Sequence, residues 1–264
     1  MAHLPDILAF TRDRVRALRP EREALERAAS QAPAPPAWPR SVPGGRVAVI
    51  AEVKRRSPSA GAIAPGLDPG RLAAAYAAGG AAAISVLTEA SFFGGSLDDL
   101  AAVRRAVPLP ALRKDFLLDP VQMFESRAAG ASAVLLIVRA LDPGLLRELS
   151  ALARALGLAR LVEVHTAVEL DLATTLEPEA IGVNSRDLDT FTVSLDGIAP
   201  LLQAVPDHIL AVAESGIGSA DDVARVAAWG ADAVLVGTAL ARAGDPARAV
   251  AALAGVPRRG RAAA

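Results

Sequence analysis

The composition of the chain excludes several classes of protein. It has 264 residues, of which 52% are hydrophobic and only 3% aromatic, so small aliphatic side chains must fill a large core. The 28 basic and 29 acidic residues nearly balance, which argues against a nucleic-acid-binding protein. The absence of cysteine excludes disulfides, thiolate zinc sites and a cysteine nucleophile.

The first 45 residues differ from the rest of the chain. Residues 5–30 have the pattern of an amphipathic helix with Arg and Glu on its exposed face. The Pro-rich stretch 31–45 can be neither a regular helix nor a central strand. We expect an ordered connector attached by Trp38, with a flexible linker as the alternative. No run is typical of a signal peptide or approaches about 18 uninterrupted apolar residues, so we expect a cytoplasmic protein without membrane contact.

Eight short apolar runs follow, each leading into a helical stretch: 47–53, 81–87, 110–113, 132–138, 160–164, 180–184, 209–214 and 232–237. Such alternation is typical of a parallel sheet covered by helices. The segments "GGAAAISVL", "GASAVLLIV" and "GADAVLVG" repeat one unit, and their glycines suit the left-handed end of a helix. The pattern predicts an α/β fold, a single (β/α)8 TIM barrel over 46–256, between an N-terminal extension (1–45) and a basic tail (257–264). A doubly wound open sheet is the alternative, but the chain has no G-x-G-x-x-G fingerprint.

Rare residue types end three of these runs. Only two of the 28 basic residues are lysines, and the chain has one asparagine. Lys54 ends the first run, Lys114 the third and Asn184 the sixth. The C-terminal strand ends of a parallel barrel carry its active site. Because a partly buried lysine can release its proton and an arginine cannot, these lysines indicate acid–base or Schiff-base chemistry. A structural ion pair with a core carboxylate is the alternative.

Three glutamates are expected in the same layer as the lysines: Glu52, Glu163 and Glu214. Glu52 and Lys54 lie two residues apart, so they share a strand face and can form either an acid–base pair or a buried salt bridge. Glu163 interrupts an apolar strand and must meet a cation or a ligand, because an unpaired buried carboxylate is costly. Asn184 and Arg186 share a face and can donate to one ligand, with a surface charge as the alternative for Arg186.

Glycine-rich turns follow the last two runs. In "AESGIGSADD" and "VGTALARAGD", small residues let backbone N–H groups approach an anion, at the usual phosphate-binding position of this fold. The candidates are Ser215, Gly216, Gly237 and Thr238, and ordinary turn chemistry is the alternative. His165 and Glu169 are four residues apart, but without an H-E-x-x-H motif we expect no metal site and a packing or capping role for His165.

Six longer segments resemble one known family in order across roughly 48–240: "EVKRRSPSAG", "SVLTEASFFGGSLDDL", "LRKDFLLDPVQMFESRAAGA", "LVEVHTAVEL", "GVNSRDLDTF" and "AVAESGI". They are similar to the signature segments of indole-3-glycerol phosphate synthases. The resemblance implies a carboxy-lyase of tryptophan biosynthesis that needs no cofactor or metal. Its phosphorylated small-molecule substrate would be 1-(2-carboxyphenylamino)-1-deoxyribulose 5-phosphate, converted to indole-3-glycerol phosphate, CO2 and water. We expect a monomer, with a weak dimer as the alternative.

The resemblance also implies roles for individual residues. Lys114 would be the general acid of ring closure, and Glu163 and Lys54 would serve the dehydration. Glu52 would orient Lys54, and Asn184 would bind polar groups of the substrate. Ser57, Phe93, Phe116, Arg186, Leu188 and Glu214 would line the pocket, and Ser215, Gly216, Gly237 and Thr238 would hold the phosphate.

Two positions depart from the family pattern. Ala60 follows Ser59 where many members have lysine, and Arg55 or Arg56 is the cation that can compensate. Thr238 stands where serine or glutamate is common.

Three other functions use similar residues. A Schiff-base aldolase also needs a barrel lysine and a phosphate site, and borohydride trapping of an adduct would identify it. A phosphoribosylanthranilate isomerase can use a cysteine–aspartate pair, and the chain has no cysteine. A non-catalytic binding barrel would leave costly buried charges at the mouth without a purpose.

Overall fold

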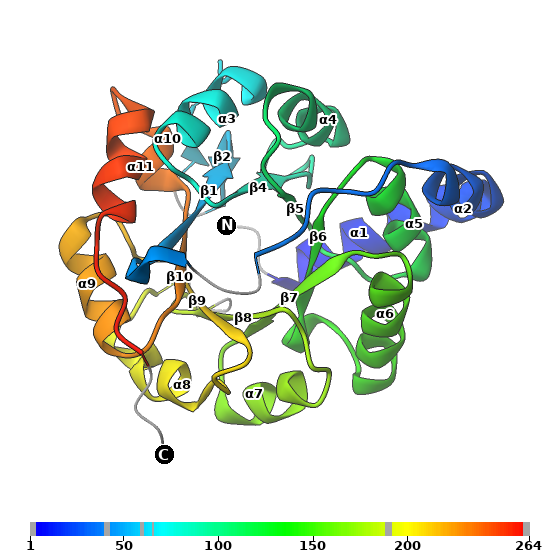
Figure 1. The fold of residues 1–264 in the computed structure, drawn as a ribbon. Coiled ribbons are helices and arrows are strands. Elements are labelled where there is room, and N and C mark those ends of the chain that lie inside the picture. Colours follow the sequence, from blue (N-terminus) through cyan, green and yellow to red (C-terminus); the bar gives the residue numbers. More distant parts are fainter. Residues whose placement is uncertain (1–3, 40–42, 59–60, 65, 188–191, 261–264) are drawn as a thin grey trace.

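The computed structural model describes residues 4–39, 43–58, 61–64, 66–187 and 192–260 (Figure 1). Eight parallel strands form a closed barrel, each paired with its neighbours in chain order and the last with the first. They are β1 (Ala48–Val53), β4 (Ala83–Leu87), β5 (Ala111–Lys114), β6 (Ala133–Ile137), β7 (Ala159–Val164), β8 (Ala180–Asn184), β9 (Leu210–Glu214) and β10 (Ala233–Val236). The predicted TIM barrel is confirmed. A short hairpin after β1, of β2 (Arg56–Ser57) and β3 (Gly61–Ala62), was not predicted.

Helices surround the barrel (Figure 1). They are α3 (Pro69–Ala78), α4 (Leu97–Ala106), α5 (Pro120–Ala128), α6 (Pro143–Ala155), α7 (Ala167–Thr174), α8 (Ala199–Ala204), α9 (Ala220–Ala228), α10 (Thr238–Ala241) and α11 (Pro246–Ala254). An Asp-Pro pair starts α3, α5, α6 and α11. The aspartate accepts backbone N–H groups of the first turn and the proline occupies the first positions, where no N–H partner is needed. None of the helices in the described ranges is long and apolar enough to span a membrane.

The glycines of the internal repeat have the predicted conformation. Gly80, Gly130 and Gly230 follow α3, α5 and α9 with φ of +89°, +83° and +97°. This left-handed region is readily available to glycine alone, so the residue ends the helix and turns the chain toward the next strand. The sequence repeat therefore reflects one structural unit used three times.

The N-terminal extension is not the single helix predicted for residues 5–30. It consists of α1 (Leu4–Leu18), the 3-10 turn η1 (Arg19–Glu21) and α2 (Arg22–Gln31). Pro20 lies in the turn, because proline has no N–H to donate and its ring crowds the preceding helical turn. Helix α2 packs beside α5, outside the barrel (Figure 1).

Trp38 attaches the Pro-rich stretch to the barrel, as predicted. Its side chain is buried in the cluster that fills the barrel interior, with the first residues of several strands, such as Ala48, Ala133 and Ala233. These alanines leave space at the N-terminal end of the barrel, and the indole fills it.

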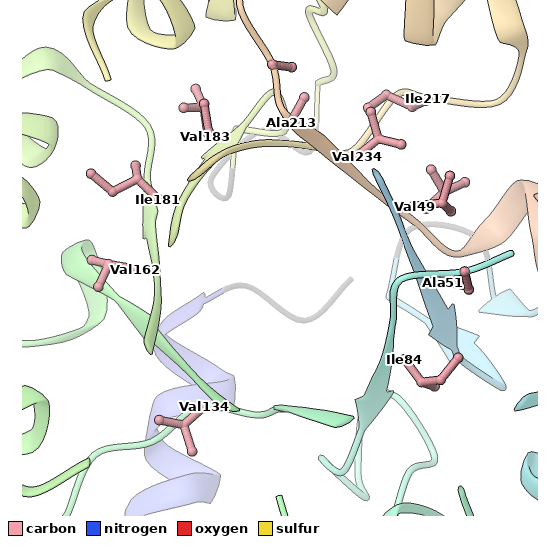
Figure 2. Packing of buried hydrophobic residues seen from close by; sticks show 14 of the residues in the cluster. Val49, Ala51, Ile84, Val134, Val162, Ile181, Val183, Ala213, Ile217 and Val234 are labelled. Atoms are coloured by element: carbon pink, nitrogen blue, oxygen red, sulfur yellow. The ribbon is translucent and has the colours of Figure 1, made fainter. Parts of the chain in front are cut away.

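The core has two layers, one on each side of the sheet. Side chains such as Val49, Ile84 and Val162 point outward and pack under the helices (Figure 2). Inward positions hold residues such as Leu112 and Leu161. Because strand side chains alternate, the next inward position two residues later falls at the C-terminal end of each strand. That end carries the polar residues described next.

Candidate active site

A cavity of about 550 Å³ opens at the C-terminal end of the barrel. Every predicted site residue within the described ranges lines it: Glu52, Lys54, Ser57, Phe93, Lys114, Phe116, Glu163, Asn184, Arg186, Glu214, Ser215, Gly216, Gly237 and Thr238. Leu188 lies outside the described residues. The strands thus bring together residues that are up to 186 positions apart in the sequence, Glu52 and Thr238.

Lys114 sits between two carboxylates. Its Nζ lies 2.9 Å from Glu214 Oε2 and 3.4 Å from Glu163 Oε2. Burial acts to lower the pKa of Lys114, but the negative charges of Glu214, Glu163 and Glu52 outweigh it and raise the pKa. Burial alone does not remove the proton in this site, so Lys114 is an ammonium with a proton to donate.

Glu163 is the centre of a hydrogen-bonded chain. Its Oε1 accepts from Asn184 Nδ2 at 3.0 Å, and Asn184 Oδ1 accepts from the backbone N–H of Arg186 at 3.0 Å. Burial acts to raise the pKa of Glu163, but Lys114, His165 and Asn184 together lower it. Of the two partners expected for Glu163, a cation or a ligand, the structure supplies a cation, Lys114.

Glu214 is the second carboxylate on Lys114 and differs from Glu163. Burial raises its pKa to about 7, against the opposing charge of Lys114 and with a further contribution from Glu163. On the neighbouring strand, a methyl group at Gly182 would collide with the Glu214 carboxylate, so the glycine makes room for it. Two buried carboxylates with pKa values pushed in opposite directions around one ammonium are typical of acid–base sites.

We expect Glu214→Gln to flatten the pH dependence of stability. An unfolded glutamate has a pKa of about 4.3, so between that pH and about 7 the folded protein holds a proton that the unfolded chain has lost. The stabilisation is complete below the unfolded pKa and disappears as pH rises through about 7. Urea unfolding from pH 4 to 9 measures it. Glu179→Gln is the control, since Glu179 lies outside the cavity and Arg160 lowers its pKa, which affects the acidic side instead. Equal profiles for the wild type and Glu214→Gln would contradict the assignment.

Glu52 and Lys54 form the predicted pair on one strand face. Glu52 Oε1 lies 2.6 Å from Lys54 Nζ, and the Lys54 side chain is 16% exposed. Gly237 lies beside the pair, where a methyl group would collide with the Glu52 carboxylate. The lysine and its counter-ion therefore both line the cavity.

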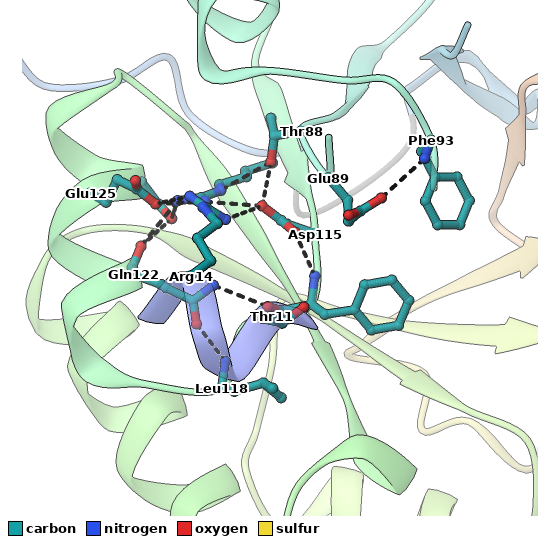
Figure 3. Close-up of polar contacts among 12 residues, drawn as sticks. Thr11, Arg14, Thr88, Glu89, Phe93, Asp115, Leu118, Gln122 and Glu125 are labelled. Carbon is teal, nitrogen blue, oxygen red and sulfur yellow. Dashed lines mark hydrogen bonds and ion pairs between the residues drawn. The ribbon is translucent and has the colours of Figure 1, made fainter. Parts of the chain in front are cut away.

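A buried ionic cluster surrounds Asp115 and Glu125 (Figure 3). Arg113 Nη2 contacts Asp115 Oδ2 at 3.0 Å and Glu125 Oε2 at 2.7 Å. Arg14 of α1 reaches the same two carboxylates at 3.1 and 2.6 Å. Arg113 does not line the cavity, whereas Asp115 lines it and also belongs to the cluster. The cluster anchors α1 to the residues that flank Lys114.

Phe93 and Phe116 form an aromatic wall. Their ring centroids are 6.4 Å apart with an interplanar angle of 36°. The backbone N–H of Phe93 donates to Glu89 and that of Phe116 to Asp115 (Figure 3). Both rings therefore come from backbone segments that buried carboxylates hold in place, and they offer a face to a planar aromatic ligand.

The turns after β9 and β10 lie side by side because these strands pair. Ser215 and Gly216 both have left-handed backbones, with φ of +66° and +70°, and a methyl group at Gly216 would press on Val193. The Ser185 hydroxyl donates to the Ser215 carbonyl at 3.0 Å. For serine this conformation is strained, and such strain is common at binding sites.

Some cavity residues were not predicted. Leu4 and Ile7 of α1 line it, and so does Arg242, which lies four residues after Thr238, one helical turn away. The spacing of four residues from Thr238 is the sequence signal that could have identified Arg242. The cations proposed to compensate for Ala60 do not line the cavity: Arg55 is bound to Asp99 and the Leu67 carbonyl, and Arg56 is exposed.

Comparisons with known proteins agree with this geometry. Residues 4–253 match the family model "Indole-3-glycerol phosphate synthase". Curated proteins of that name include one from Kineococcus radiotolerans, 50% identical over 96% of this chain and 95% of its own, and one from a Nocardioides species, 57% identical over 79% and 80%. The barrel resembles a solved 3-hexulose-6-phosphate synthase at 15% identity, with a TM-score of 0.63 over 78% of this chain and 98% of that one. This likeness concerns the fold alone.

Proposed function

The chain belongs to the indole-3-glycerol phosphate synthase family, and from this premise we propose how its barrel mouth divides the family's reaction among its residues. The enzyme converts 1-(2-carboxyphenylamino)-1-deoxyribulose 5-phosphate into indole-3-glycerol phosphate, CO2 and water, in tryptophan biosynthesis. The ring carbon that bears the carboxylate attacks the ribulose carbonyl, CO2 leaves, and a hydroxyl is then lost as water. The first stage needs one acid, and the second needs an acid and a base.

Lys114 is the acid of ring closure in this proposal. The attacked carbonyl oxygen becomes an alkoxide, which is basic enough to take a proton from an ammonium even when nearby carboxylates raise its pKa. Glu163 and Glu214 keep the proton on Lys114 until that moment and fix its position. The 2.9 and 3.4 Å contacts of Lys114 with these two residues are the observation that carries the proposal.

Lys54 and Glu163 serve the dehydration. One protonates the departing hydroxyl, and the other takes the proton whose loss restores aromaticity. Two observations support this: the pKa of Glu163 is lowered beside Lys114, and Lys54 Nζ lies 2.6 Å from Glu52 Oε1. Asn184 holds Glu163 and remains in the cavity wall, where it can contact substrate.

Arg186, the Phe93–Phe116 wall and Ser57 complete the substrate pocket in the proposal. Arg186 supplies a cation beside Asn184, and the aromatic wall receives the anthranilate ring. The phosphate lies against the backbone N–H groups of Ser215, Gly216, Gly237 and Thr238.

Arg242 adds a cation to the phosphate end. It lies one helical turn after Thr238 at the cavity rim, and it has no ion-pair partner among the described residues. In this proposal Arg242 supplies the positive charge that many family members place on a lysine at the position of Ala60.

We expect Arg242→Leu to raise KM by about three- to tenfold with little change in kcat, since about 1.4 kcal/mol corresponds to a factor of ten. The expected contact between Arg242 and the phosphate has the same strength in the ground state and in the transition state, so its loss changes KM and not kcat. Steady-state kinetics at two salt concentrations measure it, with the exposed Arg248 of α11 replaced by leucine as the control. Equal KM values for the two variants would remove Arg242 from the site.

The function itself has a direct test. The purified protein receives the carboxyphenylamino-deoxyribulose phosphate, with no metal or nucleotide added, and indole fluorescence is followed. Appearance of indole-3-glycerol phosphate with one equivalent of CO2 is expected. Folded protein that gives no indole signal, or a borohydride-trapped adduct on Lys114, would contradict this function.

A further inference from the structure

The proposed reaction does not use His165, although the residue lies beside its machinery. The imidazole follows β7 and is only 5% exposed. Both ring nitrogens are buried and neither has a hydrogen-bond partner among the described residues. An unpaired buried polar group is costly, so a position that keeps one is a candidate for function.

The ring lies between two carboxylates. Nε2 is 3.5 Å from Glu163 Oε1, and Nδ1 is 3.5 Å from Glu169 Oε2. Glu169 of α7 also accepts from the backbone N–H of His165 at 2.6 Å and lies 3.3 Å from Arg139. Glu169 is therefore fixed on two sides, and it holds the imidazole from behind while the other nitrogen faces Glu163.

The charges around the ring favour a donor on each nitrogen. The groups that face it are Glu163 from β7 and Glu169 from α7, with Lys114 of β5 and Arg139 of η3 (Val138–Ala140) behind them. A neutral imidazole would set one lone pair against a carboxylate, whereas a ring protonated on both nitrogens meets an acceptor at each. The distances of 3.5 Å are long for hydrogen bonds, and such contacts often tighten when substrate binds.

We propose that His165 is a positioning residue for Glu163, donating one ring N–H toward Glu163 and the other toward Glu169, and so keeping the Glu163 carboxylate ionised and aimed at Lys114. This rests on the proposed role of Glu163 in the dehydration, with the ionised Glu163 as its base. The consequence is a chain of contacts that runs from Glu163 through His165 and Glu169 to Arg139. A histidine that only filled space would have no such effect on Glu163.

The kinetic test uses His165→Gln, which keeps an amide donor and removes the charge. Loss of a neighbouring cation makes Glu163 easier to protonate, so the acidic limb of the dehydration rate should move to higher pH by roughly 1–3 units. We expect about tenfold slower dehydration at pH 6 with KM within about twofold, and near-normal rates on the alkaline side. Glu169→Gln should move the limb in the same direction. The control is His208→Gln, because His208 is exposed and absent from the cavity lining.

A second measurement does not depend on activity. Nitrogen-15 NMR of labelled histidine in the full-length protein reports protonation of each ring nitrogen. Because Nε2 lies 3.5 Å from Glu163, we expect the ring-nitrogen signals of His165 to change in Glu163→Gln and those of the exposed His208 to stay the same. His165 signals that Glu163→Gln leaves unchanged, or superimposable pH profiles for His165→Gln and His208→Gln, would overturn the proposal. Failure of the wild type to make indole would instead count against the proposed function.

Discussion

Lys114→Arg is expected to remain folded and to close the indole ring about 10²–10⁴-fold more slowly, the usual effect of losing a general acid. A guanidinium keeps its positive charge and satisfies Glu163 and Glu214, but it does not release its proton. Its planar group is also wider than the ammonium that fits between carboxylates 2.9 and 3.4 Å away. Single-turnover indole fluorescence measures the rate, and circular dichroism checks the fold.

Lys54→Arg is the matched control, because Lys54 is the only other lysine and lines the same cavity with the same 16% exposure. Under the proposed division of roles, Lys54→Arg slows dehydration and the cyclised intermediate accumulates. Lys114→Arg acts earlier, so the open substrate accumulates instead. Near-normal turnover in Lys114→Arg would mean that Lys114 contributes only its positive charge and is not the general acid. Accumulation of the same intermediate in both variants would mean that the two lysines do not act in separate steps.

The second large effect concerns stability. Arg113→Met should lower the free energy of unfolding by about 3–5 kcal/mol, the cost of removing one partner from a buried ionic cluster. Arg113 is fully buried and binds Asp115, Glu125 and the Ser126 hydroxyl. Among the described residues, its loss leaves Arg14 as the one cation that contacts these two buried carboxylates. Urea unfolding at pH 7 measures the change.

Two comparisons distinguish the loss of the buried ionic cluster from the effect of replacing any arginine. Arg19→Met breaks the exposed Arg19–Asp119 pair, with 64% of the Arg19 side chain exposed, and should cost less than about 1 kcal/mol. Adding Asp115→Asn and Glu125→Gln to Arg113→Met should recover part of the lost stability, because the two carboxylates left without Arg113 are then neutral. A cost for Arg113→Met as small as that of Arg19→Met would contradict the expectation.

Most of the barrel could be predicted from the sequence, because the same local signals recur along the chain. Apolar runs, Asp-Pro pairs and left-handed glycines mark each strand and helix within one unit. The layer of Glu52, Lys114 and Glu163 was also predictable, since strand alternation places the last inward position at the mouth. The single helix predicted for 5–30 failed at Pro20, a local signal that was present and overlooked.

Other features depend on contacts that local patterns do not encode. The sequence indicates that Lys114 meets a carboxylate but not that it meets both Glu163 and Glu214, since which strands lie opposite depends on barrel closure. The pKa of Glu214 depends on burial that only the packed cavity creates. The position of α1 was equally hidden, because Arg14 finds its partners in α5 and after β5.

The anchor of α1 has a consequence for synthesis of the protein on the ribosome. Arg14 is translated 101 positions before its partner Asp115. At 5–20 residues per second that gap lasts roughly 5–20 s. During this time the face of α1 with Ile7, Leu8 and Val15 has no barrel to cover. Helix α1 is therefore synthesised well before its partners exist, and we expect nascent chains halted before Asp115 to be more sensitive to proteases within α1 than chains halted after Glu125.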